Sequence, residues 1–581
     1  MPYIHTEETP VNCKLLKKIQ SRRGMENGTV NGEMAFKKSD TFRISRDISD
    51  KEKATIARRK TEVYNCLQKF GMNCTMSSLP SIAILGSGGG LRAMIALQGV
   101  LAELQKQGLL DAVMYLCGVS GSTWCMSYIY EHEEWVTQLP NLEKKLCEQL
   151  TNTAWSAKKA FDALVEPSKD DTYSLTDFWG NVIVNAMLHE LDYHYFSEER
   201  RVSSYGKVPY PIYAAVDSNK LANNSKTHPD IWFEFTPDEA GFIHRGAFVD
   251  MRLFGSVFEN GKLKEIKEEK SISYLRGLWG SAIASFKAIE DFIKHLIFEI
   301  KNLAFVYEEL VGEDVGEVEK EVENVGCPKP EEPQGSGCDC HSISAVTNHL
   351  MNAIEEKSHE QYDEHIRKLT KFLEAERFQH IIHNETKRSI WDTLRILRKT
   401  VSCLFEWKWG TISNYLYKCT ELNDKDLERH EDIKLVDAGL AINSAYPLVL
   451  RPERGVKLIL SFDFSEGDPF ETVKDAALYC KESQLPFPDI DISELEKSKD
   501  NPSDCYIFQG NNAPVVMHFP LFNTGNCRDK VEDWRERYST IKLSYTEEDI
   551  KDLLEGAKTN VRNNTERILQ AMKNLNILYH S

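Results

Sequence analysis

Four glycines within five residues separate an apolar run from a helical pattern, and this arrangement limits the possible folds more than any other feature of the chain. Residues 81–85 form the apolar run, and residues 91–107 carry apolar side chains at helical spacing. The glycine loop (residues 86–90) is therefore predicted between a buried strand and a helix amino terminus, where unpaired amides favour an anion. A dinucleotide-binding loop is excluded because Leu91 stands where the third glycine belongs, and no Gly-Lys-Ser/Thr follows to make a Walker loop. A glycine turn without any ligand remains the alternative.

A serine occupies a similar position one supersecondary unit later. Residues 112–117 predict the next strand, and Gly-Val-Ser-Gly-Ser follows at 118–122 before a helical pattern. Small neighbours suit a tight turn that exposes the Ser120 hydroxyl, although Ser122 stands where the usual pattern has glycine and serines are common in ordinary turns. The separation of the two loops matches one βαβ unit, whose crossover brings both to the same sheet edge. A serine nucleophile beside an anion-binding loop is the arrangement that acyl transfer requires.

The Ser120 hydroxyl needs a group that takes its proton. None of the sixteen histidines lies in an informative context. Asp437 is the better candidate, because it ends an apolar segment and precedes the small residues Ala438 and Gly439. An Asx turn or a helix cap is the common alternative for such an aspartate.

These segments are similar to those of the cytosolic phospholipase A2 family (group IV), and within it to the gamma type. The resemblance covers about residues 50–527. It rests on a collinear set of motifs: Ser-Gly-Gly-Gly-Leu-Arg at 87–92, Gly-Val-Ser-Gly-Ser at 118–122, Val-Asp-Ala-Gly-Leu at 436–440, and further similar segments at 173–177, 209–212, 232–237, 275–281 and 446–452.

The resemblance implies a patatin-like α/β catalytic core, with a central, mostly parallel sheet, flanking helices and a cap or lid insertion. It also implies a catalytic dyad without histidine, in which Ser120 is the nucleophile and Asp437 its base. The family chemistry implies no metal and no cofactor.

The remaining site residues follow from the same resemblance. The amides of Gly89 and Gly90 would stabilise an oxyanion. Arg92 and Arg454 would hold the substrate phosphate through charge-assisted hydrogen bonds. A surface ion pair is the alternative for Arg454.

Composition limits the partners and the compartment. The net charge of −18 disfavours nucleic-acid binding and long-range attraction to anionic membranes. The sequence shows no apolar run of spanning length, no signal peptide and no compact cysteine framework. We therefore expect a protein of the cytoplasm that binds phospholipid membranes peripherally and reversibly, on internal membranes such as the endoplasmic reticulum and nuclear envelope.

Two features distinguish this chain within the family it resembles. Too few residues precede position 81 for an eight-stranded β-sandwich, so calcium-triggered membrane targeting is not expected. No cysteine stands among the last four residues, so the sequence shows no prenylation motif.

The chain divides into a tail and one large unit. Residues 1–45 are polar and predict a disordered tail, and residues 46–581 form the predicted catalytic domain. Residues 281–311 show apolar spacing that predicts a helix packed on the core or forming part of a cap. Residues 311–341 are acidic and rich in Pro and Gly, which predicts a flexible insertion.

We therefore predict a calcium-independent serine phospholipase A2 that converts glycerophospholipids to free fatty acid and lysophospholipid. Lysophospholipase and transacylase activities would use the same dyad, and a lysophospholipase or transacylase that hardly acts on two-chain lipids is one alternative. A catalytically silent lipid-binding or scaffold member of the family is the other, and labelling by a serine-reactive fluorophosphonate would distinguish it.

Overall fold

The computed structural model describes residues 42–298 and 385–578, except 153–156, 191, 193, 285–286, 288, 295, 423 and 528–529, together with six residues between 347 and 354. The acidic insertion predicted at 311–341 lies outside the described residues. So does the predicted tail, apart from its last residues. Of these, Phe42–Ile44 form strand β1, which pairs with β7, so the folded part begins earlier than predicted.

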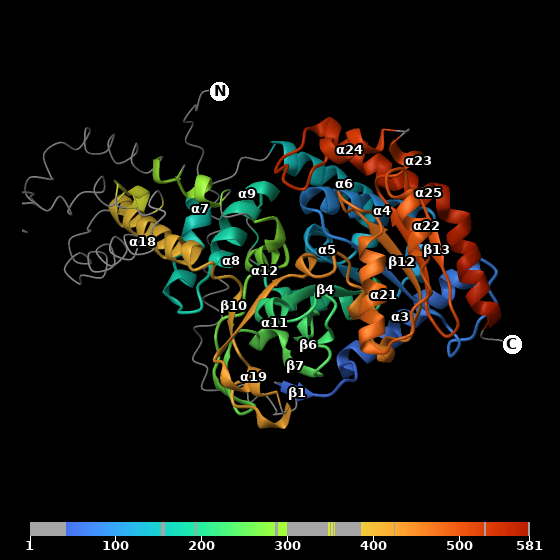
Figure 1. Cartoon of the computed structure of the whole chain (residues 1–581), viewed down its shortest axis with the longest axis horizontal. Coiled ribbons are helices and arrows are strands. Elements are labelled where there is room, and N and C mark those ends of the chain that lie inside the picture. The colour runs from blue at the N-terminus through green and yellow to red at the C-terminus, as the bar shows by residue number, and fades with distance from the viewer. Residues whose placement is uncertain are drawn as a thin grey trace, which may run out of the picture.

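A twelve-stranded sheet runs through the centre of the molecule (Figure 1). Its main path has the order β1-β7-β6-β5-β4-β3-β2-β12-β14-β13, with β11 beside β4 and β10 beside β11. The strands beyond β1 are β2 (Ser81–Gly86), β3 (Tyr115–Gly118), β4 (Tyr210–Asp217), β5 (Trp232–Phe235), β6 (Glu239–Phe242), β7 (Ala247–Asp250), β10 (Thr411–Ser413), β11 (Asp432–Asp437), β12 (Val456–Asp463), β13 (Tyr506–Phe508) and β14 (Val515–Pro520), while β8 (Val257–Glu259) and β9 (Lys262–Glu265) form a separate hairpin.

The five central strands, β4, β3, β2, β12 and β14, are parallel, and antiparallel strands flank them. Strands buried on both faces are apolar almost throughout, and the sequences of β2 and β12 show this. The predicted α/β core with a parallel centre is thus confirmed.

Helices cover the sheet, and those next to the two motifs lie where the sequence predicts them. They are α4 (Gly90–Lys106) and α5 (Gly121–Tyr130), and helix α3 (Asp50–Lys69) precedes β2. The long helix α25 (Glu547–Leu578) packs beside α4 (Figure 1). The others are α6 (Trp135–Asn152), α7 (Ala157–Asp162), α8 (Leu175–Phe178), α9 (Asn185–Leu188), α10 (Arg200–Ser203), α11 (Ser218–Asn223), α12 (Ile272–Trp279), α18 (Glu385–Phe405), α19 (Lys425–Arg429), α20 (Tyr446–Val449), α21 (Glu471–Ser483), α22 (Ile492–Ser498), α23 (Thr524–Cys527) and α24 (Val531–Arg537).

The segment predicted as a core-packed or cap helix is described only in part. Within it, Ile289 and Ile293 are fully buried, which fits packing on the core. No helix among the described residues is both long enough and apolar enough to span a bilayer.

Candidate active site

The turn between β3 and α5 holds Ser120 in a backbone conformation that side chains rarely adopt. Its φ and ψ are 52° and −124°, and the residue is almost fully buried. Such strain in a non-glycine residue is typical of functional turns, where surrounding packing maintains it. A Cβ on Gly121 would overlap the carbonyl oxygen of Gly90, so the residue after Ser120 must be glycine for the two loops to touch.

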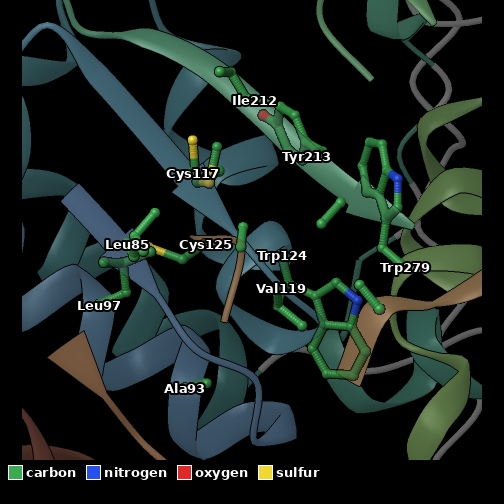
Figure 2. Close-up of a cluster of buried hydrophobic side chains, with 14 of the residues drawn as sticks. Leu85, Ala93, Leu97, Cys117, Val119, Trp124, Cys125, Ile212, Tyr213 and Trp279 are labelled. Atoms are coloured by element: carbon green, nitrogen blue, oxygen red, sulfur yellow. The ribbon is translucent and has the colours of Figure 1, made fainter. Parts of the chain in front are cut away.

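Buried aromatic side chains hold this turn in place (Figure 2). Trp124 of α5 donates its indole N–H to the Arg276 carbonyl oxygen at 2.9 Å. Trp279 of α12 stacks on Tyr213 of β4 with ring centroids 4.5 Å apart. These side chains lie with Val119 in one cluster that joins β3, β4, α5 and α12. The Ser120 backbone is therefore supported from several elements at once.

Strand β4 brings Asp437 to the same place. Strand β3 runs parallel to β4 and ends with Gly118 beside Tyr213. Strand β11 runs antiparallel to β4 and ends with Asp437 beside Ala215. The carboxyl ends of β3 and β11 therefore meet head to head, about 7 Å apart along β4. This arrangement joins residues that lie more than three hundred positions apart in the sequence.

Asp437 is fully buried, and two backbone N–H groups donate to its side chain. Its carboxylate accepts from the backbone N–H of Gly439 at 2.8 Å and of Ala282 at 3.1 Å, and the nearby Ser120 side chain also favours its ionised form. Burial raises the pKa of Asp437 to about 6, although these hydrogen bonds to the ionised form oppose the rise. At neutral pH the carboxylate is charged and more basic than an exposed aspartate, so it can take a proton from Ser120.

The glycine loop lies directly beside Ser120. Gly89 and Gly90 have φ values of 148° and 59°, which favour glycine at both positions. Gly90 is the first residue of α4, so the first amides of this helix have no intrahelical acceptors, and the helix dipole favours negative charge there. The structure thus brings Ser120, Asp437, Gly89 and Gly90 together.

The side chains of Asn443 and Ser87 fix the glycine loop. Asn443 Nδ2 donates to the Gly88 carbonyl oxygen at 3.3 Å, and the Ser87 hydroxyl donates to the same oxygen at 3.3 Å. The Ser122 hydroxyl donates to the Ser87 carbonyl oxygen at 2.6 Å and so ties the serine turn to the loop. Ser122 was visible as a departure from the usual pattern, whereas nothing local in the sequence marks Asn443.

Arg92 is buried, and each of its three guanidinium nitrogens donates one hydrogen bond within the protein. Its Nε donates to the Phe464 carbonyl oxygen at 2.7 Å, Nη1 to the Tyr538 carbonyl oxygen at 2.5 Å, and Nη2 to Thr540 Oγ1 at 3.0 Å. The guanidinium lies against Gly89, since a Cβ there would be 2.7 Å from Nη2. In this position Arg92 supports the glycine loop with three of its five N–H groups, and the phosphate contact that the resemblance implied stays a prediction.

Arg454 lies elsewhere. Its guanidinium forms a fully buried ion-pair cluster with Glu52 of α3 and Glu234 of β5, with separations of 2.9 and 2.8 Å. It stands 5.6 Å from the ring of Tyr115, at the amino end of β3, whereas Ser120 follows the carboxyl end. Burial opposes the charge, but Glu234 and Glu52 outweigh it and raise the pKa of Arg454. Neither the predicted phosphate-binding role nor the alternative surface ion pair is supported by this position.

The Arg454→Met variant is expected to lose roughly 3–5 kcal/mol of unfolding free energy, because Glu52 would be left buried without its partner. The control Lys551→Met removes an ion pair with Glu547 in which both side chains are exposed, and it should leave the unfolding free energy almost unchanged. Urea unfolding followed by tryptophan fluorescence measures both. A folded variant of unchanged stability but with a greatly raised KM would instead restore a substrate-binding role for Arg454.

Among the described residues, one group could offer ligands to a metal ion. Glu131, Asp192 and His194 have ligand atoms within 4.8 Å of one another. Arg276 already lies 3.4 Å from Asp192, and His194 Nδ1 lies 2.7 Å from the same carboxylate. Asp192 and Glu199 raise the pKa of His194 to about 10 against the opposing effect of burial. A protonated imidazole and a guanidinium disfavour a further cation, so these residues do not fit a metal.

Comparisons with known proteins identify the family of the chain. A family model for the lysophospholipase catalytic domain matches residues 82–501, which include Ser120 and Asp437. Cytosolic phospholipase A2 gamma of Mus musculus is 37% identical over 548 residues, 90% of this chain and 91% of the relative. The Homo sapiens protein of that name is 37% identical over 547 residues, 92% of this chain and 96% of the relative.

A solved structure of human GIVD cytosolic phospholipase A2 shares the fold. Its TM-score is 0.64 at 22% sequence identity, and the match covers 93% of this chain and 66% of that chain. With a family model across most of the chain and near full-length relatives above 30% identity, the protein belongs to the cytosolic phospholipase A2 family and is a phospholipase A2/lysophospholipase enzyme.

Proposed function

We propose that this enzyme is a calcium-independent serine phospholipase A2 that works through a Ser120–Asp437 dyad. The observation that carries the proposal is the meeting of the carboxyl ends of β3 and β11, which brings Ser120 to the buried Asp437 carboxylate, whose pKa burial raises to about 6, beside a glycine loop at a helix amino terminus. The products are a free fatty acid and a lysophospholipid.

In the first half-reaction, Ser120 Oγ attacks the ester carbonyl carbon while its proton moves to Asp437. The amides of Gly89 and Gly90 stabilise the oxyanion that forms. When the tetrahedral intermediate collapses, the C–O bond of the ester breaks, and the departing alkoxide takes the proton from Asp437. Lysophospholipid leaves, and the acyl group remains on Ser120.

In the second half-reaction, Asp437 takes a proton from water while the water oxygen attacks the acyl carbon; the bond to Ser120 Oγ then breaks, Ser120 takes the proton back from Asp437, and the fatty acid leaves. A lysophospholipid hydroxyl in place of water gives transacylation. A single-chain lipid as the first substrate gives lysophospholipase activity. The three reactions share one acyl-enzyme, so we assign all three to this site.

This scheme requires no calcium ion, because protein groups accept the proton and stabilise the negative charge that develops. Asp437 receives the proton, and backbone amides receive the oxyanion. The test is release of labelled fatty acid from phosphatidylcholine labelled in the sn-2 chain, with excess EGTA or with calcium. Equal rates support the proposal, and a rate that requires calcium contradicts it. One-chain and two-chain substrates compared in the same assay rank the three activities.

Asn443 supports the oxyanion site by fixing a peptide orientation. The N–H of a trans peptide points opposite to its C=O, and no described peptide is cis. Because Asn443 and Ser87 hold the Gly88 carbonyl, the Gly89 N–H points to the other side of this peptide. Asn443→Ala should therefore lower kcat by roughly 10-fold to 100-fold with little change in KM. A change in KM alone would contradict this positioning role.

The pH dependence of kcat/KM should follow the ionisation of Asp437. Only the carboxylate can accept the Ser120 proton, so the rate should fall about tenfold per pH unit below pH 6 and reach half its plateau near pH 6. Unfolding would not explain the loss, because a carboxyl whose pKa is raised in the folded state stabilises that state when it is protonated. A profile that stays flat down to pH 4.5 would exclude Asp437 as the base.

For the cell, we propose a cytoplasmic enzyme that binds internal membranes such as the endoplasmic reticulum and nuclear envelope reversibly. The word "cytosolic" in the names of its relatives supports the first part. Imaging of the tagged full chain, followed by extraction of the membranes with high salt or carbonate, tests the second.

A further inference from the structure

The turn that joins α24 to α25 presents apolar side chains to solvent. Tyr538 and Tyr545 are buried at its base, with ring centroids 5.7 Å apart. At its tip, Ile541 is 80% exposed and Leu543 is 45% exposed. We call residues 538–545 the apolar turn. Single exposed apolar residues are common, so the position of this pair decides whether it has a role.

The apolar turn is attached to the glycine loop. The Thr540 carbonyl oxygen would lie 3.5 Å from a Cβ on Gly90. Arg92 binds the Tyr538 carbonyl oxygen and Thr540 Oγ1 while its guanidinium lies against Gly89. One buried side chain therefore fixes the turn relative to the proposed oxyanion amides. Ile541 immediately follows the residue that contacts the loop.

A second apolar side chain borders the dyad from another segment. Leu440, three positions after Asp437, is also exposed. Ile283 lies between these two segments, because its Cδ1 would be 3.7 Å from a Cβ on Gly90, and its neighbour Ala282 donates to Asp437. Three segments with apolar side chains thus reach the glycine loop or Asp437: the apolar turn, residues 282–283 and residues 437–440.

The charges at the turn are balanced. Lys542 stands between Ile541 and Leu543, and its Nζ donates to Asp549 Oδ2 at 3.1 Å and to the Arg537 carbonyl oxygen at 3.2 Å. Glu466 accepts from the Thr540 amide at 2.7 Å and lies 3.7 Å from Arg92. With no strong excess of either sign among these residues, the turn suits a zwitterionic surface better than an anionic one.

We propose that Ile541 and Leu543 insert into a zwitterionic phospholipid bilayer and so hold the active site against its substrate. This inference rests on the proposed function, since it names the surface from which the same site takes its lipid. A phospholipid carries its esters at the bilayer interface, whereas Ser120 and Asp437 are buried. Docking through side chains fixed to the glycine loop would bring the two together.

The test compares two double variants. Ile541→Ser/Leu543→Ser removes the proposed docking surface. The matched control Leu478→Ser/Ile492→Ser removes another exposed apolar pair (52% and 56%), on α21 and α22. Sedimentation with sucrose-loaded phosphatidylcholine vesicles measures binding without catalysis. Hydrolysis of a short-chain phosphatidylcholine below its critical micelle concentration measures the site without a membrane.

We expect the turn variant to bind vesicles roughly 10-fold to 100-fold more weakly and the control to bind as the wild type does. Hydrolysis of the monomeric lipid should stay within about twofold in both variants. Unchanged vesicle binding of the turn variant overturns the proposal, and so does an equal loss in the control. A concentration-dependent dimer that the turn variant abolishes would assign the surface to a second copy instead. If the wild type binds vesicles but hydrolyses neither lipid, the proposed function fails while docking stands.

Discussion

Replacement of Ser120 by alanine should lower phospholipid hydrolysis at least roughly 10⁴-fold, because the variant has no group that can carry the acyl chain. The fold should be unaffected, since the variant loses only one hydroxyl group, and the aromatic cluster around the turn stays in place. Release of labelled fatty acid from sn-2-labelled phosphatidylcholine measures the loss. The exposed Ser77→Ala variant is the matched control and should be fully active.

A fluorophosphonate reagent gives an independent measure of the same site. It should label the wild type and Ser77→Ala at Ser120 and leave Ser120→Ala unlabelled. Equal hydrolysis by wild type and Ser120→Ala would show that another residue is the nucleophile. A wild type that neither hydrolyses lipid nor reacts with the reagent would favour a lipid-binding or scaffold role.

Replacement of Asp437 by asparagine should lower kcat/KM by roughly 10³-fold or more, because the Ser120 proton then has no acceptor of comparable basicity. The same variant should unfold at a temperature no lower than that of the wild type. A pKa that burial raises from 3.8 to about 6 corresponds to roughly 3 kcal/mol against the ionised form at neutral pH. The asparagine side chain has the same shape and no charge, so the variant does not carry the free-energy cost of a buried carboxylate.

Thermal unfolding and kinetics together decide the role of Asp437. The exposed Asp171→Asn variant should change neither quantity. Lost activity with retained or increased stability is the pattern expected of a residue held charged for catalysis. If Asp437→Asn loses activity and also unfolds far more easily, the carboxylate acts as a structural cap for the Gly439 and Ala282 amides instead.

The glycine loop and the serine turn could be predicted from the sequence, because each is formed by residues that are neighbours in the chain. The apolar run, the glycines and the helical spacing identified β2, the glycine loop and α4 to within one residue. Helix α5 also began within two residues of its predicted start. Strand β3 is shorter than predicted, because residues 110–112 form a 3-10 turn before it. Spacing alone placed the two loops at one edge through the rules for parallel βαβ units.

The rest of the site depends on pairing between distant strands, which periodicity does not reveal. Nothing in the sequence of β11 shows that it runs antiparallel to β4 and ends opposite β3. Asp437 was assigned through family resemblance for this reason. The same resemblance gave Arg454 a role in phosphate binding, while the structure places it with Glu52 and Glu234, two carboxylates that are remote from it in sequence.

Strand β12 lies in the centre of the sheet, so the sheet cannot be completed until this late part of the chain has been translated. Strand β12 pairs with β2, yet it begins 370 residues after β2 ends. At about 5 to 20 residues per second, the ribosome takes roughly 20 to 75 s to produce it. Throughout that interval the nascent chain exposes an apolar strand edge, which is prone to aggregate. Production of active enzyme should therefore depend on chaperones that bind the nascent chain until its last third has been synthesised.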